Sequence, residues 1–308
     1  MTDPLAASGR PRTAHPADAV PSDAPAPDRL AVDHRPLDGL LPHHAASLRA
    51  VADHLAADPT VLGVVLGGSI AHGYATPASD LDLTVVVPPD EYRRRVAENR
   101  LHWNDTDLCT YPGGYVDAKF VDTAFLEDVA AYGSDVARWA FLHNRVLLDR
   151  TEPGPDGGTL TDLVARIAQF PVHEQDERVR TFAAHLLAWR WYLEESAVKE
   201  SRYLRGLAVQ RLVLFACRLT LAADAMLCPS HKWILQETAR APHRLPDLLE
   251  RLDLLLADPS QDRAEALISD LFAHHGQDRD DLDAHWPSLF LRDTELAWWH
   301  RRPTAADL

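Results

Sequence analysis

Residues 61–87 read VLGVVLGGSIAHGYATPASDLDLTVVV, and this stretch gives the strongest indication of the fold. A short, valine-rich apolar run ends at Gly67-Gly68-Ser69, ten residues follow from Ile70 to Ser79, and a second apolar run opens with Asp80-Leu81-Asp82-Leu83. Apolar runs of this length, bounded by glycine or proline, predict buried strands. The stretch therefore predicts a strand, a loop and a second strand, with polar residues at the end of the first and the start of the second.

The second strand carries two carboxylates on one face. Side chains alternate along a strand, so Asp80 and Asp82 project together while Leu81 and Leu83 face the core. Two like charges held side by side are unfavourable unless a cation lies between them. Carboxylate oxygens select hard ions such as Mg²⁺ or Mn²⁺, and Mg²⁺ is usually held by carboxylates together with substrate phosphates. The pair therefore predicts a divalent metal site for a phosphate-bearing ligand.

The glycines that precede the loop suit the same ligand. Gly67 and Gly68 let the backbone approach a phosphate closely, and exposed amides together with the Ser69 hydroxyl can donate to its oxygens. A lone Gly-Gly-Ser is usually a turn, and a lone Asp-x-Asp is usually a solvated strand end. Their conjunction at this spacing, each against a buried strand, is far more specific and predicts a nucleotide site.

The order Gly-Ser, ten residues, then Asp-x-Asp on a strand resembles the signature of the DNA polymerase beta nucleotidyltransferase superfamily. The stretch GGSIAHGYATPASDLDL is most similar to the small-molecule branch, which includes aminoglycoside nucleotidyltransferases and in which a serine, here Ser79, directly precedes the paired aspartates. This resemblance implies metal-dependent nucleotidyl transfer from a nucleoside triphosphate. It assigns Asp80 and Asp82 to catalysis and metal binding, and it assigns Gly67, Gly68, Ser69 and Ser79 to the nucleotide.

Members of this superfamily use a third carboxylate on a neighbouring strand. Residues 115–121 form a third apolar alternation, which contains Asp117 and Lys119 on one face, while Asp122 lies on the other. The apolar neighbours of Asp117 match the pattern of the family better. We therefore expect Asp117 to be the third catalytic and metal-binding residue, with Asp122 as the alternative.

Weaker candidates lie elsewhere. The run Ser230-His231-Lys232-Trp233 is predicted to start a helix with Ser230 as its N-cap, and similar nucleotidyltransferase-like proteins carry a Lys-Trp pair here. The resemblance implies that Lys232 neutralises triphosphate charge; a surface lysine beside a core tryptophan is the alternative. His72 and Tyr74 are candidates either for base or phosphate contacts or for loop packing. Candidates for phosphate contact or for a general base are Arg202, Arg205, Arg211, Glu194 and Glu195.

The composition limits the classes of partner that we expect the protein to bind. The net charge is −15, from 46 acidic and 31 basic residues, which argues against a nucleic acid and suits a small or cationic acceptor. The sequence shows no uninterrupted apolar stretch of membrane-spanning length, and Cys109, Cys217 and Cys228 show no metal-ligand spacing. We expect a cytoplasmic protein with free thiols and no membrane span. The oligomeric state is left open.

The chain is predicted to be an α+β protein in three parts. Residues 1–42 contain eight of the 22 prolines and predict a disordered Pro/Ala-rich arm. Residues 43–150 predict a nucleotidyltransferase domain with a small mixed sheet and flanking helices. A linker at 151–158 leads to a helical, bundle-like substrate-binding domain at 159–308, where apolar residues recur with a period near 3.6.

The expected reaction is transfer of a nucleoside monophosphate, AMP from ATP, to a hydroxyl group of a small molecule, with release of pyrophosphate. An aminoglycoside-like antibiotic or a natural-product intermediate is the expected acceptor class. Three alternatives stay open: nucleotidylation of a protein or RNA, a non-catalytic nucleotide sensor, and a metal site adapted to a different activated donor.

Overall fold

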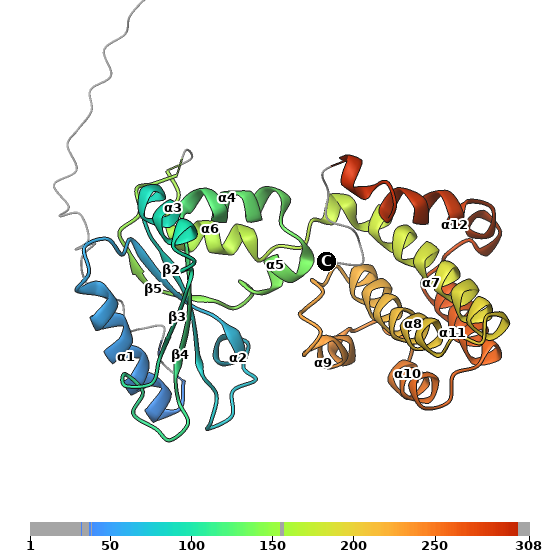
Figure 1. Ribbon diagram of the computed structural model, residues 1–308, viewed down its shortest axis with the longest axis horizontal. Helices are drawn as coiled ribbons and strands as arrows, with labels where there is room; N and C mark the ends of the chain where they lie inside the picture. Colours follow the sequence, from blue (N-terminus) through green and yellow to red (C-terminus); the bar gives the residue numbers. More distant parts are fainter. Residues whose placement is uncertain (1–31, 33–36, 38, 155–156, 301–308) are drawn as a thin grey trace, which may run out of the picture.

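The computed structural model describes residues 32, 37, 39–154 and 157–300. These residues form a sheet unit and a helical unit that lie side by side (Figure 1). The arm predicted at residues 1–42 lies almost entirely outside the described residues. Within the sheet unit the elements are α1 (Pro42–Ala56), β1 (Gly63–Leu66), α2 (Gly68–Ala71), β2 (Leu81–Val86), α3 (Pro89–Ala97), β3 (His102–Asp105), β4 (Val116–Val121), α4 (Thr123–Tyr132), α5 (Asp135–Trp139), β5 (Arg145–Asp149) and α6 (Leu160–Ile167).

Five strands form one mixed sheet in the order β3-β4-β2-β1-β5. Strands β2 and β4 are parallel, and the other neighbouring pairs are antiparallel. The α+β class and the mixed sheet are therefore confirmed. The apolar runs predicted β1, β2 and β4, whereas the edge strands β3 and β5 were missed because neither is a continuous apolar run. In β3, exposed and half-buried residues alternate.

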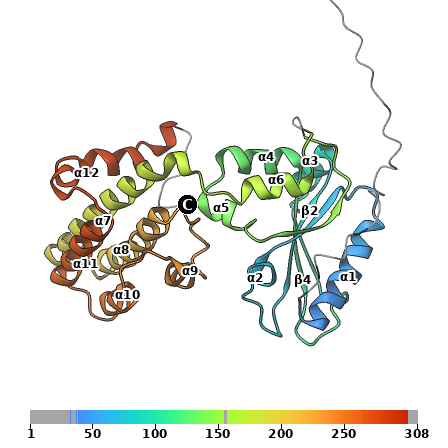
Figure 2. The same cartoon turned by 180° about the vertical axis from the view of Figure 1, so that it is seen from behind.

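The two faces of the sheet are covered differently. One face packs Leu81, Leu83 and Ala118 against Leu48 and Val51 of α1. The opposite face packs its valines against α4 and α6. Figure 2 shows α1 on the side of the sheet that is remote from the helical unit. The second face is therefore the one that can meet the helical unit.

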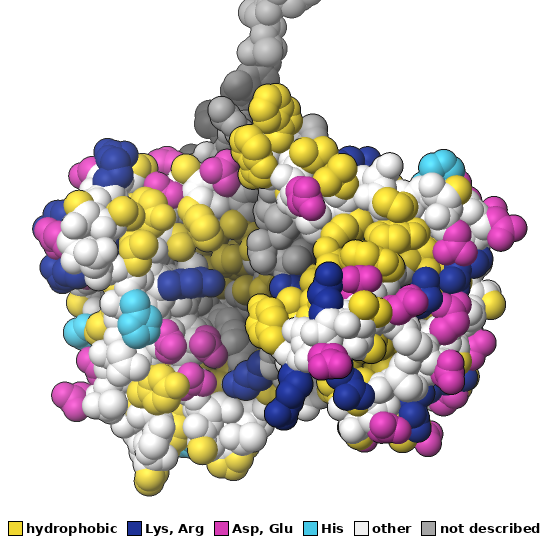
Figure 3. Space-filling view, turned by 45° about the vertical axis from the view of Figure 1, so that its right-hand side comes forward, with side chains coloured by type: hydrophobic (Ala, Val, Ile, Leu, Met, Phe, Trp, Pro, Cys, Tyr) yellow, Lys and Arg dark blue, Asp and Glu magenta, His cyan; other side chains and the backbone are white. Residues whose placement is uncertain are grey.

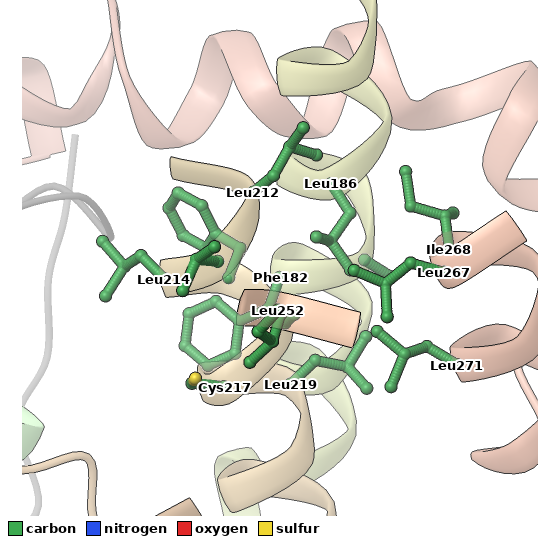
Figure 4. Close-up of a cluster of buried hydrophobic side chains, with 14 of the residues drawn as sticks. Phe182, Leu186, Leu212, Leu214, Cys217, Leu219, Leu252, Leu267, Ile268 and Leu271 are labelled. Carbon is green, nitrogen blue, oxygen red and sulfur yellow. The ribbon is translucent and has the colours of Figure 1, made fainter. Parts of the chain in front are cut away.

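The helical unit is built around two long helices, α7 (Gln175–Val198) and α8 (Arg202–Ala223). Short elements and helices surround them: η2 (Val172–Glu174), α9 (Ile234–Arg240), α10 (Leu248–Ala257), α11 (Gln261–His274), α12 (Arg279–Asp293) and η3 (Ala297–His300). Figure 4 shows leucine and phenylalanine side chains from α7, α8, α10 and α11 meeting in one core. The predicted helical region is confirmed.

Helix α8 is long and apolar enough to cross a membrane, and among the described residues it alone meets that criterion. However, 72% of its apolar stretch is buried inside the fold. Its apolar side chains form part of the core of the helical unit, as in the central helix of a bundle. The three cysteines are free thiols, as expected, with Cys217 and Cys228 buried in this unit.

Two local features differ from the sequence interpretation. The buried side chains of α6, including Leu160 and Ile167, belong to the same cluster as Val65 and Val86 of the sheet, so this helix packs with the sheet unit. The predicted N-cap at Ser230 is wrong: residues 231–233 form a turn, and α9 begins only at Ile234, without a side-chain cap. The Ser230 carbonyl instead accepts a hydrogen bond of 2.9 Å from the Trp233 amide.

A buried ion cluster joins the two units. Asp135 in α5 is 1% exposed, and its carboxylate pairs with Arg178 of α7 and, at 3.6 Å, with Arg218 of α8. Arg218 is itself fully buried. A buried charge is strongly unfavourable without its partners, so the arrangement requires α5 to stay docked on α7 and α8.

We expect Asp135→Ala to destabilise the protein by about 3 kcal/mol, because it leaves buried arginine charge without this carboxylate. The matched control is Glu127→Ala, which breaks an exposed pair with Arg166 at 2.6 Å and should cost less than about 1 kcal/mol. Urea unfolding followed by circular dichroism measures both. Equal unfolding midpoints for the two variants would contradict a structural role for the buried cluster.

Candidate active site

The parallel pairing of β2 and β4 brings the predicted carboxylates together. Asp82 and Asp117 are direct partners in the register of the two strands, so both side chains project from the same face. Asp80 lies two residues before Asp82, and ligand oxygens of the three carboxylates lie within 4.8 Å of one another. The alternative residue, Asp122, instead caps α4 by accepting a 2.8 Å hydrogen bond from the Phe125 amide.

These carboxylates occupy the open half of a sheet face. Further along the same strands and on the same face, Val86 and Val121 are buried under α4 and α6. The half that carries Asp82 and Asp117 lies beyond these helices and borders the helical unit. Figure 3 shows a hollow between the two units, with a group of acidic side chains on the sheet unit beside it and basic side chains on both units.

The glycine turn is fitted to the carboxylates. Gly68 has a φ of +61°, and a Cβ placed there would lie 1.7 Å from a carboxylate oxygen of Asp82. The Ser69 backbone amide donates a hydrogen bond to the Asp82 carboxylate, and the Gly67 amide donates to the Asp82 carbonyl at 2.9 Å. Only glycine at position 68 leaves room for Asp82, which explains the Gly-Gly-Ser sequence at this point.

Two predicted nucleotide-binding hydroxyls lie in different surroundings. The Ser69 Oγ is buried and has no hydrogen-bond partner among the described residues. The Ser79 Oγ accepts a 2.9 Å hydrogen bond from the Thr76 amide and so closes the loop that leads to Asp80. The Ser79 carbonyl accepts from Tyr111 at 2.5 Å. In this geometry Ser69 has an uncommitted hydroxyl, and Ser79 shapes the loop.

Burial and neighbouring negative charges shift the pKa values of residues in the site. Burial raises the pKa of Asp82 to about 6, with further contributions from Asp80 and Asp117. The Ser69 amide and the Lys232 charge oppose this rise. Tyr115 donates to Asp80, and this hydrogen bond raises the pKa of the Tyr115 phenol to about 12. His102 Nε2 lies 2.9 Å from Asp117 Oδ1. Tyr115 and His102 were missed by sequence reasoning because β3 and the start of β4 carry no motif.

The donor set fits a hard divalent cation. Three carboxylates on one sheet face supply oxygen ligands and up to three negative charges, which suits Mg²⁺ or Mn²⁺. A bound cation would also stabilise the ionised Asp82 carboxylate, whose pKa is raised by burial and by the neighbouring Asp80 and Asp117. Asp80, Asp82 and Asp117 are therefore the residues that could hold a metal ion.

Positive charge faces the carboxylates from two sides. Lys119, on the same face of β4 as Asp117, interacts electrostatically with Asp82 and Asp117. Lys232 belongs to the helical unit and lies just before α9. Its positive charge lowers the pKa of Asp82 and so opposes the effect of burial. The structure thus brings Lys232 near the predicted site although 150 residues separate it from Asp82 in the sequence.

The loop residues between the glycines and the aspartates are largely committed to protein contacts. His72 stacks on Trp139 with ring centroids 3.8 Å apart, and burial lowers its pKa to about 4. Tyr74 stacks on Trp233 of the helical unit at 4.5 Å. Of the two interpretations that the sequence left open, packing describes the observed positions of both rings.

Three of the five remaining candidates make contacts within the helical unit. Arg205 donates to the Pro259 carbonyl at 2.8 Å, the Arg211 guanidinium lies 5.9 Å from the Trp189 ring, and Glu195 pairs with Lys199 at 3.1 Å. These contacts are compatible with the structural interpretation of each residue.

Comparison with known proteins identifies a family domain in part of the chain. Residues 48–132 match the family model described as a nucleotidyltransferase domain, and this range includes the glycine turn and all three carboxylates. The chain is also similar to a nucleotidyltransferase-like protein from Exiguobacterium sibiricum 255-15, with 15% identity over 81% of this chain and 79% of that chain and a TM-score of 0.44. No curated protein matches. The expectation of a nucleotidyltransferase is confirmed, whereas the aminoglycoside branch stays a prediction.

We expect Gly68→Ala to lower turnover by at least about 100-fold, because its Cβ would displace the Asp82 carboxylate by more than an ångström. Gly73→Ala is the matched control: Gly73 also has a positive φ, +75°, but open space surrounds the position of its Cβ. It should cost about 1 kcal/mol of stability and retain activity. Pyrophosphate release and thermal unfolding measure the two effects, and equal losses of activity would contradict the steric explanation.

We also expect Asp82→Asn to stabilise the metal-free protein at pH 8. The pKa of Asp82 is about 6 in the folded state against 3.8 for a free side chain, so its ionisation above pH 6 opposes folding. Removing the charge should add at most about 3 kcal/mol, and the gain should shrink as the pH falls to 5. Thermal unfolding in EDTA tests this, and Mg²⁺ should stabilise wild type more than the variant. A variant less stable than wild type at pH 8 would contradict the assignment.

Proposed function

We propose that this nucleotidyltransferase transfers AMP from ATP to a hydroxyl group of a small molecule and releases pyrophosphate. The observation that carries the proposal is the cluster of Asp80, Asp82 and Asp117 beside the glycine turn, on a sheet face that borders the helical unit. A location in the cytoplasm, where ATP and Mg²⁺ are abundant, agrees with this activity.

The chain's own residues supply position and charge. Asp80 and Asp82 would hold a divalent ion against the triphosphate, and Asp117 would complete a second ion site near the acceptor. When bound, such ions neutralise phosphate charge and lower the pKa of the acceptor hydroxyl. The turn at Gly68 and Ser69 would approach the phosphates with its backbone and free hydroxyl, and Lys232 would face them from the helical unit.

The transfer itself is a displacement at the α-phosphorus. The acceptor oxygen forms a bond to that phosphorus and releases its proton to solvent, while the bond to the oxygen that bridges to the β-phosphate breaks. The electron pair of the broken bond leaves with pyrophosphate. Protein groups fixed around the reacting atoms lower the barrier by holding the two substrates in line.

The helical unit forms the second wall of the site and is the natural source of acceptor specificity. The overall charge of −15 would favour an acceptor that carries amino groups, because an acidic field attracts cations. We therefore propose a hydroxylated and cationic small molecule, such as an amino sugar of the aminoglycoside type or a related natural-product intermediate.

The direct test is pyrophosphate release from each of the four ribonucleoside triphosphates with Mg²⁺, against a panel of amino sugars and nucleosides. Asp117→Ala should reduce acceptor-dependent release at least about 100-fold, because an electrostatic contact to the reacting groups is lost. The matched control, Asp122→Ala, removes a helix N-cap and should cost about 1 kcal/mol of stability while keeping activity within a few-fold.

Other outcomes would redirect the proposal. Loss of turnover in Asp122→Ala, with Asp117→Ala active, would overturn the choice of third carboxylate. ATP binding without turnover for any small acceptor would favour a macromolecular target, which intact-mass analysis of candidate partner proteins after incubation with ATP would detect.

A further inference from the structure

One side chain of the sheet unit is enclosed by the helical unit. The Tyr74 ring lies nearly parallel to the Trp233 ring, with an angle of 11° and centroids 4.5 Å apart. The guanidinium carbon of Arg240 lies 4.4 Å from the centroid of the Tyr74 ring. The Tyr74 hydroxyl donates a short hydrogen bond to Glu237, which also pairs with Arg240 at 3.4 Å. Stacking, a cation over the ring and a charged acceptor therefore act on one tyrosine.

Each end of this contact leads to the candidate active site. On the sheet side, the Tyr74 amide donates to the Ser69 carbonyl at 2.8 Å, and the Ser69 amide donates to the Asp82 carboxylate. On the helical side, Trp233 directly follows Lys232, whose Nζ lies 5.0 Å from the centroid of the Trp233 ring. The positive charge of Lys232 acts in turn on Asp82. This series of contacts therefore connects the glycine turn to the stacked rings of Tyr74 and Trp233, and connects Trp233 through Lys232 to the Asp82 carboxylate.

We propose that Tyr74 is a positioning residue, which by stacking on Trp233 holds Lys232 close to the Asp82 carboxylate for binding the triphosphate. The inference rests on the proposed function, since it takes Lys232 to be a phosphate ligand. The Trp233 ring and the Arg240 guanidinium both pack on the Tyr74 ring, so we assign this ring a role through its protein neighbours and not as a platform for the base.

A lysine held in this way should act mainly on nucleotide binding. Its contact with the β- and γ-phosphates exists both in the bound substrate and in the transition state, so its loss raises KM for ATP and leaves kcat nearly unchanged. Tyr74 and Lys232 should also depend on each other, because Tyr74 contributes to ATP binding only through the place it gives to Lys232. The second consequence distinguishes positioning from a direct contact.

The test is a double-mutant cycle of Tyr74→Ala and Lys232→Ala, read as KM and kcat for ATP. Each single variant should raise KM about tenfold with kcat within about threefold of wild type, and the double variant should also raise KM about tenfold. Tyr74→Phe keeps the ring stack and should stay within about threefold of wild type. Tyr132→Ala, at an 81% exposed tyrosine on α4, is the matched control and should change neither constant.

Two results would overturn the inference: an unchanged KM in Tyr74→Ala, or a KM increase of about 100-fold in the double variant, which would mean that Tyr74 and Lys232 act independently. Thermal unfolding checks that the variants fold, and Tyr74→Leu replaces Tyr74→Ala if the latter does not. If wild type shows no turnover, the proposed function fails, and the same cycle is read in the Kd for Mg²⁺-ATP by calorimetry. A wild type that neither turns over nor binds ATP would overturn both proposals.

Discussion

The pairing of β2 with β4 is the constraint on which the rest of the site depends. In this parallel pair Asp82 lies directly opposite Asp117, and the pleat turns both side chains to the same face. Asp80 adds a third carboxylate at the entrance of the strand. The fold thus holds together three groups that would repel one another in water, and the strand hydrogen bonds prevent them from moving apart.

Neighbouring residues are arranged around this concentration of charge. Gly68 leaves the space that Asp82 needs, the Ser69 amide donates to its carboxylate, and Tyr115 donates to Asp80. None of these contacts offsets the effects of burial and of the neighbouring carboxylates, since the pKa of Asp82 remains raised to about 6. The crowded carboxylates lower the stability of the fold but enable the site to attract cations, a combination that is common in active sites.

The second unit completes the site from the opposite side, and two contacts of different kinds fix its place. The buried charges of Asp135 and Arg218 join α5 to the helical core, and the ring stack of Tyr74 on Trp233 joins the active-site loop to the segment before α9. The first contact is buried and holds the units together, and the second is half-buried and has the proposed role of positioning Lys232.

Local patterns in the sequence predicted the class of fold and the candidate site residues of the sheet unit. The period-two and continuous apolar runs located β1, β2 and β4, because strand alternation acts over a few residues. The resemblance of the glycine turn with Asp80 and Asp82 to a family signature implied a nucleotidyltransferase. The same resemblance, together with the alternation in residues 115–121, led to Asp117 as the expected third carboxylate. Long-range relations did not follow: His102 reaches Asp117 from an edge strand without an apolar run, and Glu237 meets Tyr74 across 163 positions. The tertiary structure set both contacts, because the first depends on the pairing of β3 with β4 and the second on how the helical unit packs against the sheet unit. No local pattern of side chains encodes either arrangement.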